Sequence, residues 1–194
     1  GKAAGAKSLK ALIADARARP GAVTYGSGGT GSISHIVGEA FARVADVQLT
    51  HVPYKGNGPA MADLAGGHVD LVFDGLATSR PLATQGRARM LAISGARRNP
   101  AAPDLPTFAE QGVRDYEAYT WNCLMAPAAT PPETIARLNQ ALNQALARPA
   151  IKERFDQAGV DILGPSTPAQ AEAFGRKERE RWVPFVRSLK LEVN

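Results

Sequence analysis

Residues 25–32, with the sequence Tyr-Gly-Ser-Gly-Gly-Thr-Gly-Ser, constrain the fold of this chain more than any other segment. They lie between a β-like run at 22–25 and an apolar-periodic run that begins at Ile33. Glycines let a backbone turn tightly and approach a ligand closely. A helix that starts near Gly31 leaves its first N–H groups unpaired and points its positive dipole end outward. The sequence therefore predicts a strand, a glycine-rich turn and a helix start that together form a small anion-binding cradle.

Helix-like and strand-like runs alternate through the first part of the chain. Apolar spacing predicts helices at residues 9–16, 33–44 and 58–64 and strands at 22–25, 47–52, 69–73 and 89–94. Strands separated by helices in this order indicate a parallel sheet with helices on its faces, which is an α/β fold.

A proline-rich connection at residues 99–106 separates this part from a second one. The second part is expected to contain, in order, a strand at 119–126, a helix that starts in a capping box at Thr130, a helix that ends at Gly159, a short strand at 160–163 and a final helix with a capping box at Thr167. Cys123 is the only cysteine, which excludes an internal disulfide. Its apolar surroundings predict a buried, inert thiol.

The charge pattern excludes several classes of function. The net charge is +5, but the lysines and arginines are scattered among acidic residues, which is typical of a solvated surface. There is no RNA-binding aromatic motif and no zinc-finger spacing, so nucleic acid is not expected as a partner. No apolar run approaches the ~18 residues that span a bilayer.

Loops that follow three of the expected strands should meet at one edge of the sheet, because ligands gather at the carboxyl ends of parallel strands. These loops are residues 27–32, 54–58 and 74–79. Tyr54 offers an aromatic wall with a hydroxyl group. Asp74 would repel an anion, so three roles are open: it binds a ligand ammonium group, it bonds a neutral hydroxyl, or it fixes the loop by accepting hydrogen bonds.

The cradle offers the backbone N–H groups of Gly29 to Ser32 and three hydroxyl groups as donors to an anion. His35 follows on the next helix, where it either stands near the ligand or is a satisfied structural histidine. The candidate ligand-binding residues are Ser27, Gly28, Gly29, Thr30, Gly31, Ser32, His35, Tyr54 and Asp74.

Residues 26–31 also match the G-x-G-x-x-G fingerprint of dinucleotide-binding domains, which further requires an acidic residue at the end of the second strand. Here Asp46 precedes that strand, and no Gly-Lys-Ser/Thr follows the glycines. A nucleotide-binding enzyme domain is therefore a weaker alternative, and a structural turn without a ligand is another. The chain lacks a recognisable nucleophile with its base and a metal-ligand pair, so we expect no catalytic residue, no metal and no cofactor.

Four segments, residues 25–35, 51–56, 66–74 and 124–131, resemble Bug-type receptors, the extracytoplasmic solute-binding components of bacterial tripartite tricarboxylate transporters. The resemblance covers nearly the whole chain in order. It implies a two-lobed fold of periplasmic-binding-protein type II that closes on a small carboxylate: a di- or tricarboxylate, an amino acid or an aromatic acid. It also implies a periplasmic receptor, made with a signal peptide in its precursor, that delivers the ligand to membrane transporter subunits.

Relative to these receptors, the resemblance implies that the N-terminal portion is absent. Residues 1–118 would then make one complete lobe, and residues 119–194 the returning strand and C-terminal helices of the other, incomplete lobe. Apolar faces of this second part are expected to be exposed or covered by a partner, so a homodimer or a swapped assembly is predicted. A ligand-sensing effector domain of a transcription regulator can share the fold and is the main alternative function.

Overall fold

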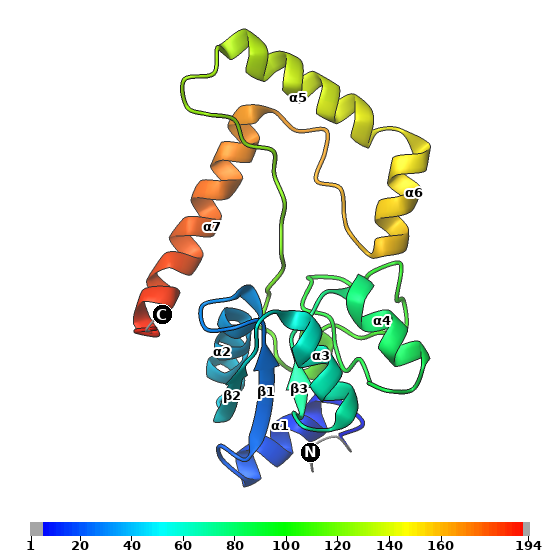
Figure 1. The fold of residues 1–194 in the computed structure, drawn as a ribbon, viewed down its shortest axis with the longest axis vertical. Helices are drawn as coiled ribbons and strands as arrows, with labels where there is room; N and C mark the ends of the chain where they lie inside the picture. Colours follow the sequence, from blue (N-terminus) through cyan, green and yellow to red (C-terminus); the bar gives the residue numbers. More distant parts are fainter. Residues whose placement is uncertain (1–5, 192–194) are drawn as a thin grey trace. The chain divides into compact units, whose positions relative to one another are not determined.

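The computed structural model describes residues 6–191, which divide into two compact units. Unit 1 runs to Thr120 and also takes in Leu191, and unit 2 is Trp121–Lys190. The division falls close to the predicted boundary between residues 118 and 119. Figure 1 shows a sheet with helices in unit 1, and three helices with extended segments before α5 and between α6 and α7 in unit 2.

Unit 1 is built on a parallel sheet, which confirms the predicted α/β class. Its strands are β1 (Val23–Ser27), β2 (Leu49–Pro53) and β3 (Leu71–Val72), in the spatial order β2-β1-β3. Both partners of β1 run parallel to it, and the register places Tyr25 beside His51 on one side and Leu71 on the other. The central strand β1 therefore determines which side chains of its two neighbours share a face.

Helices α2 (Ile33–Ala45) and α3 (Asn57–Gly66) lie on opposite faces of β1, as Figure 1 also indicates. Successive strand residues point to opposite faces of a sheet. A Cβ at Gly38 of α2 would meet the ring of Tyr25, whereas a Cβ at Gly26 would meet Ala60 of α3. The Tyr25 face is thus covered by α2 and the Gly26 face by α3.

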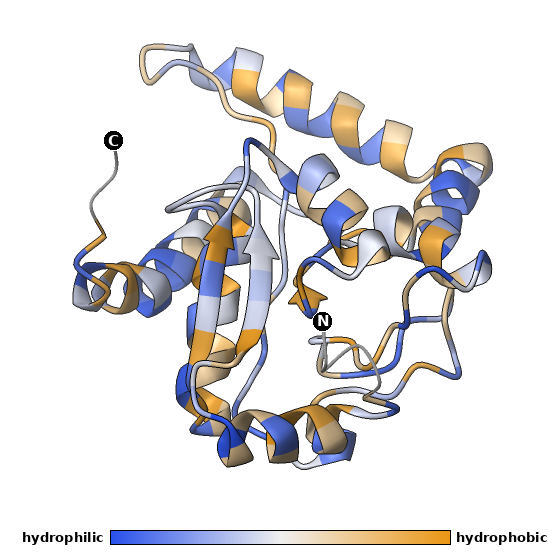
Figure 2. Cartoon of the chain, turned by 60° about the horizontal axis from the view of Figure 1, so that its bottom comes forward, coloured by the Kyte–Doolittle hydropathy of each residue, from blue (hydrophilic) through white to orange (hydrophobic). Residues whose placement is uncertain are grey.

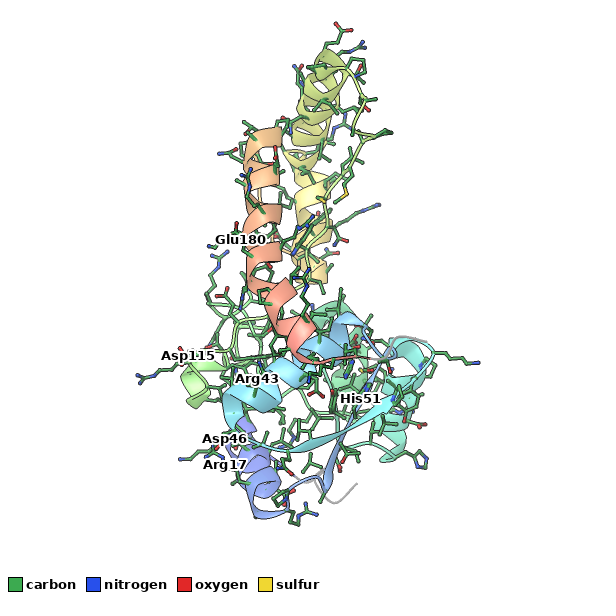
Figure 3. All side chains as sticks on the ribbon, turned by 90° about the vertical axis from the view of Figure 1, so that its left-hand side faces the viewer. Arg17, Arg43, Asp46, His51, Asp115 and Glu180 are labelled. Atoms are coloured by element: carbon green, nitrogen blue, oxygen red, sulfur yellow. The ribbon has the colours of Figure 1, made fainter. Side chains whose placement is uncertain are left out.

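Nearby side chains close the start of α1 (Leu9–Ala18) and the end of α2 in unit 1. The Ser8 hydroxyl caps α1 by accepting from Ala11 N–H at 3.1 Å. Arg17 of α1 donates to the carbonyl of Ala45 at 2.6 Å. Its positive charge there interacts favourably with the negative end of the α2 dipole. Figure 3 shows Arg17 beside Asp46, the left-handed residue at which α2 ends.

An aromatic cluster forms the centre of the unit 1 core. Phe41 of α2 contacts Phe73, Phe108 and Tyr116, with ring centroids 5.5 to 5.7 Å away. The Tyr116 hydroxyl donates to the carbonyl of Val37 at 3.0 Å. The irregular segment around the short helix η2 (Ala109–Gln111) is thereby fixed against α2.

One prediction for unit 1 is wrong, and one helix was not predicted. Residues 89–94 form no strand, because no strand among the described residues pairs with them. A single parallel bridge joins Ile93 to Thr107. Residues 76–84 form helix α4 (Leu76–Thr84), part of which the sequence assigns to the loop at 74–79; Pro81, a residue that disfavours a helix interior, lies inside it.

Unit 2 contains α5 (Pro132–Leu146), α6 (Pro149–Ala158) and α7 (Pro168–Ser188). The capping box between Thr167 and Gln170 is confirmed. The predicted box at Thr130 is wrong, because Pro131 is the capping residue of α5 and lacks a side-chain hydrogen bond. The loop before α7 is held instead by Asn139 and Asn143, which both donate to the Ser166 carbonyl.

The predicted strands at 119–126 and 160–163 are also wrong. Both segments carry β-like sequence but make no ladder, since unit 2 has no strand within the described residues to pair with them. The thiol of Cys123 is exposed rather than buried for the same reason. A strand-like sequence without a neighbouring strand to pair with remains irregular backbone.

Among the described residues, unit 2 buries no apolar side chain fully; its only buried residue is Glu178. Apolar and polar residues recur along α5 (Figure 2), yet large apolar side chains remain exposed, with Met125 at 78% as the extreme. The exposed set includes Leu124, Met125, Leu138, Leu142, Leu163 and Val183. In residues 6–191, no helix is both long and apolar enough to cross a membrane.

Candidate functional site

The three predicted loops of unit 1 meet at the carboxyl ends of the strands, where side chains connect them in series. Gly28 N–H donates to the Ser34 hydroxyl at 2.9 Å, and Ser34 donates to Asn57 Oδ1 at 2.8 Å. Asn57 Nδ2 donates in turn to Asp74 Oδ1 at 2.7 Å. This series joins the end of β1, the start of α2, the start of α3 and the segment after β3. Convergence of the loops, which the parallel order predicts, is therefore confirmed.

Most amides of the cradle loop (residues 27–32) are already hydrogen-bonded within the protein. Gly29 N–H donates to the Ser27 hydroxyl at 3.1 Å, and Gly31 N–H donates to His35 Nδ1 at 3.0 Å. Ser32 N–H donates to the carbonyl of Gly29 at 3.1 Å. The expectation that the amides of Gly29 to Ser32 all face a ligand is therefore too broad, because neighbouring side chains and a tight turn take three of them.

Two exposed residues at the mouth of α2 offer amides to an anion. The N–H groups of Thr30, Ile33 and Ser34 have no acceptor within residues 6–191. Ser34 is buried, whereas Thr30 and Ile33 are exposed, Ile33 to 58%. The Ser32 hydroxyl caps α2 by accepting from His35 N–H at 3.3 Å. Thr30 and Ile33, together with the positive end of the α2 dipole, are thus the donors that face outward.

Ser27 lies beneath the cradle loop and not on its surface. It is fully buried, and its hydroxyl lies 2.6 Å from His51 Nε2 and 3.2 Å from the carbonyl of Gly29. Ser27 therefore supports the turn from below.

His35 and His51 form a stacked pair under the same loop. Their ring centroids are 3.8 Å apart and their planes 10° apart. The register explains the contact: His51 stands beside Tyr25 on the face that α2 covers, and His35 lies one turn before Gly38 on that helix. Glu39 completes the group, with Oε1 3.8 Å from His35 Nε2 and 2.5 Å from the Tyr25 hydroxyl that donates to it.

Both rings favour the uncharged state. Burial lowers the pKa of His35, against the attraction of the Glu39 carboxylate. Burial, together with the neighbouring His35, lowers the pKa of His51 to about 4. A histidine whose pKa is depressed on folding adds stability that is fully present above its unfolded pKa of about 6.5. That stability is lost as the pH falls through the folded pKa.

Tyr54 turns its hydroxyl toward α3. It donates to Asp63 Oδ2 at 2.7 Å, and this hydrogen bond raises the pKa of Tyr54 to about 12. The Tyr54 backbone N–H donates to the Ser27 carbonyl, which continues the pairing of β1 and β2 into the loop. The half-buried ring lies over Gly26 of β1, where a Cβ would come within 3.3 Å of Tyr54 Cε2.

Asp74 makes the contacts of a loop-fixing residue. Besides the amide of Asn57, it accepts from the Thr78 hydroxyl at 2.5 Å and the Ser79 hydroxyl at 3.4 Å. These bonds attach the start of α4 to the start of α3.

Sequence reasoning missed three residues that organise this site. Ser34 lies within a predicted helix and Asn57 within the predicted loop 54–58, but neither was named as a site residue, although a short polar residue at a helix start next to a glycine loop is a usable signal. His51 could have been found from strand register, since it follows the apolar run of the second strand at the level of Tyr25. In the described part of the chain, no group of three His, Cys, Asp or Glu side chains could hold a metal ion.

The chain is similar to known proteins over almost its whole length. The family described as "Tripartite tricarboxylate transporter family receptor" matches residues 2–191. Protein BugT of Bordetella pertussis is 37% identical over 180 residues, which are 93% of this chain and 55% of BugT. The chain thus spans about half the length of this relative.

Solved structures share the fold. An R. palustris protein determined with adipate has a TM-score of 0.86 and 34% identity, and the match covers 96% of this chain and 62% of that one. MatC from Rhodopseudomonas palustris, with bound malate, has a TM-score of 0.81 and 28% identity, covering 93% of this chain and 62% of MatC. These similarities confirm the predicted periplasmic-binding-protein architecture.

Proposed function

Because the chain belongs to the tripartite tricarboxylate transporter receptor family, we propose that unit 1 is the lobe of a periplasmic receptor that binds a small carboxylate. The receptor delivers this ligand to membrane transporter subunits. The family is one of receptors and not of enzymes, so the expectation of a non-catalytic chain holds. The observation that carries the proposal is the outward-facing pair of amides at the mouth of α2.

A dicarboxylate fits the chemistry of the cradle loop. Adipate and malate, the molecules bound to two similar proteins, each carry two carboxylate groups. One carboxylate would accept from the N–H groups of Thr30 and Ile33 and from the Thr30 hydroxyl, near the positive end of α2. The Tyr54 ring would border it, while Ser27, His35 and Asp74 support the loops from behind.

The affinity of this chain should be low. Hydrogen bonds to a charged group contribute about 1.5–3 kcal/mol each, whereas immobilising a ligand costs several kcal/mol. Two or three such bonds on one carboxylate therefore give weak binding, and micromolar affinity requires donors to the second carboxylate as well.

Replacing Ile33 with proline should weaken binding of adipate and malate about tenfold or more. Proline removes the Ile33 N–H, and the first helical position tolerates it because no acceptor within residues 6–191 is lost. The extended Ser32 backbone (φ −66°, ψ 161°) also suits a residue before proline. NMR titration of the loop amides measures the dissociation constant.

The matched control is Ile33→Ala, which removes the same exposed side chain but keeps the N–H. It should bind like the unchanged protein. Equal affinity of the proline and alanine variants would show that this amide is not a ligand donor. If neither adipate nor malate shifts the loop amides, whereas NAD or ATP does, the receptor proposal is wrong.

We also propose that the exposed apolar side chains of unit 2 are covered in solution by a second copy of the chain. The unit has no buried apolar core of its own among the described residues, and exposed apolar surface drives association. Light scattering should give the mass of a dimer or larger assembly. Replacing Leu138 and Leu142 with glutamate should shift it toward the monomer; a monomeric unchanged chain would contradict the proposal.

A further inference from the structure

We infer that His35 and His51 are positioning residues that hold the cradle loop in its binding shape, and that they do so only as an uncharged, stacked pair. The inference rests on the proposed function, because it assigns the pair to the carboxylate site. Neither ring is expected to touch the ligand. Each acts through a loop group that it holds from below.

His35 acts through Gly31. Its Nδ1 accepts the Gly31 N–H at 3.0 Å and must therefore be unprotonated. Its other nitrogen, Nε2, faces the Glu39 carboxylate at 3.8 Å. A proton added at Nδ1 would oppose the Gly31 N–H, so this bond would break and the turn before α2 would lose its anchor.

His51 acts through Ser27. Its Nε2 lies 2.6 Å from the Ser27 hydroxyl, and that hydroxyl accepts the Gly29 N–H at 3.1 Å. Both halves of the cradle loop thus depend on one ring each. With centroids only 3.8 Å apart, a charge on one ring disfavours a charge on the other.

The surroundings keep the pair neutral at neutral pH. The titratable groups that face it are Glu39 from α2, which attracts a proton to His35, and Tyr25 from β1, whose phenol donates to Glu39. Burial outweighs this attraction and lowers the pKa of both histidines. Acidification from pH 7 toward pH 4 should therefore charge the pair and release the loop.

The test compares variants that keep or delete one acceptor. His35→Asn retains an oxygen near the position of Nδ1, and His35→Ala deletes it; His51→Gln and His51→Ala form the second pair. Exposed His68, replaced with alanine, is the control for loss of a histidine in the same unit. Amide hydrogen exchange at Gly29 and Gly31 is read first without ligand, and adipate affinity is then read between pH 8 and pH 4, so that the range reaches the lowered pKa of His51.

Without ligand, exchange at Gly31 should accelerate at least tenfold in His35→Ala and by less than threefold in His35→Asn and His68→Ala. Adipate should bind at least tenfold more weakly to His35→Ala and His51→Ala than to His68→Ala. As the pH falls toward 4, the affinity of the unchanged protein should decrease more steeply than that of His35→Asn. If a variant does not fold, the pH profile of the unchanged protein and the conservative variant decide the question.

Two outcomes separate the failure of this inference from failure of the proposed function. If the unchanged protein binds adipate but His35→Ala binds it equally, or if Gly31 exchange is unaffected, the positioning role is overturned while the receptor function stands. If Gly31 is released in His35→Ala but no dicarboxylate binds the unchanged protein, the receptor function and the ligand role of the pair both fall.

Discussion

Replacing Phe41 with alanine is expected to lower the free energy of unfolding of unit 1 by about 3–5 kcal/mol. The Phe41 side chain is 1% exposed and contacts three other aromatic rings from separate segments. Truncation loses the transfer energy of the ring and leaves a cavity that rigid neighbours cannot fill. The expected loss is a large part of the 5–15 kcal/mol that stabilises a typical domain.

Urea denaturation measures this effect, with unit 2 as an internal reference. Both tryptophans, Trp121 and Trp182, lie in unit 2, so their fluorescence follows that unit while tyrosine circular dichroism is weighted to unit 1. Ile33→Ala, on the exposed side of the same helix, should change the free energy by less than about 0.5 kcal/mol. A loss below 1 kcal/mol for Phe41→Ala would contradict the described core.

Replacing Gly38 with alanine should destabilise unit 1 by about 2 kcal/mol, against the usual rule. Alanine in place of glycine inside a helix normally gains up to about 1 kcal/mol. Here the new Cβ would lie 2.4 Å from Cε2 of Tyr25, a fully buried ring whose hydroxyl is bonded to Glu39. The ring has no space to move, and overpacking costs typically 1–3 kcal/mol and occasionally more. The steric cost therefore exceeds the helix gain.

Two other helical glycines provide the control. A Cβ at Gly58 of α3 or at Gly175 of α7 meets nothing within 4 Å. Alanine at either position should stabilise its own unit by a few tenths to about 1 kcal/mol. Thermal unfolding of the three variants gives the comparison, and a stabilised Gly38→Ala protein would show that α2 does not approach β1 as closely as described.

Local signals account for what could be predicted of the fold. The start of α2 after the glycines and the capping box of Thr167 depend on neighbours in the sequence, and both are found. Strand prediction failed at 89–94 and 119–126 because a strand exists only where another backbone pairs with it. Helix α4 has a weak local signal, because Pro81 disfavours a helix interior, although the helix continues through it.

The site was predictable in place but not in detail. The parallel order of the strands explains why the loops around Gly28, Asn57 and Asp74 meet. Which amides stay free depends on acceptors such as Ser34 and His35, and their orientation follows from packing rather than from spacing along the chain. For the same reason, the partnership of His35 with His51 emerges only from the register of β1 and β2.

The conformation of the cradle loop is held by the protein itself, since nearby side chains accept hydrogen bonds from the amides of Gly28, Gly29 and Gly31. The entropic cost of ordering this backbone is therefore met when the chain folds. When a carboxylate binds, the remaining entropic cost is the loss of the ligand's own translational and rotational freedom. Such preorganisation removes the need for a slow rearrangement at this half of the site. Encounter by diffusion, helped by long-range attraction between opposite charges, should then set how fast the ligand is captured.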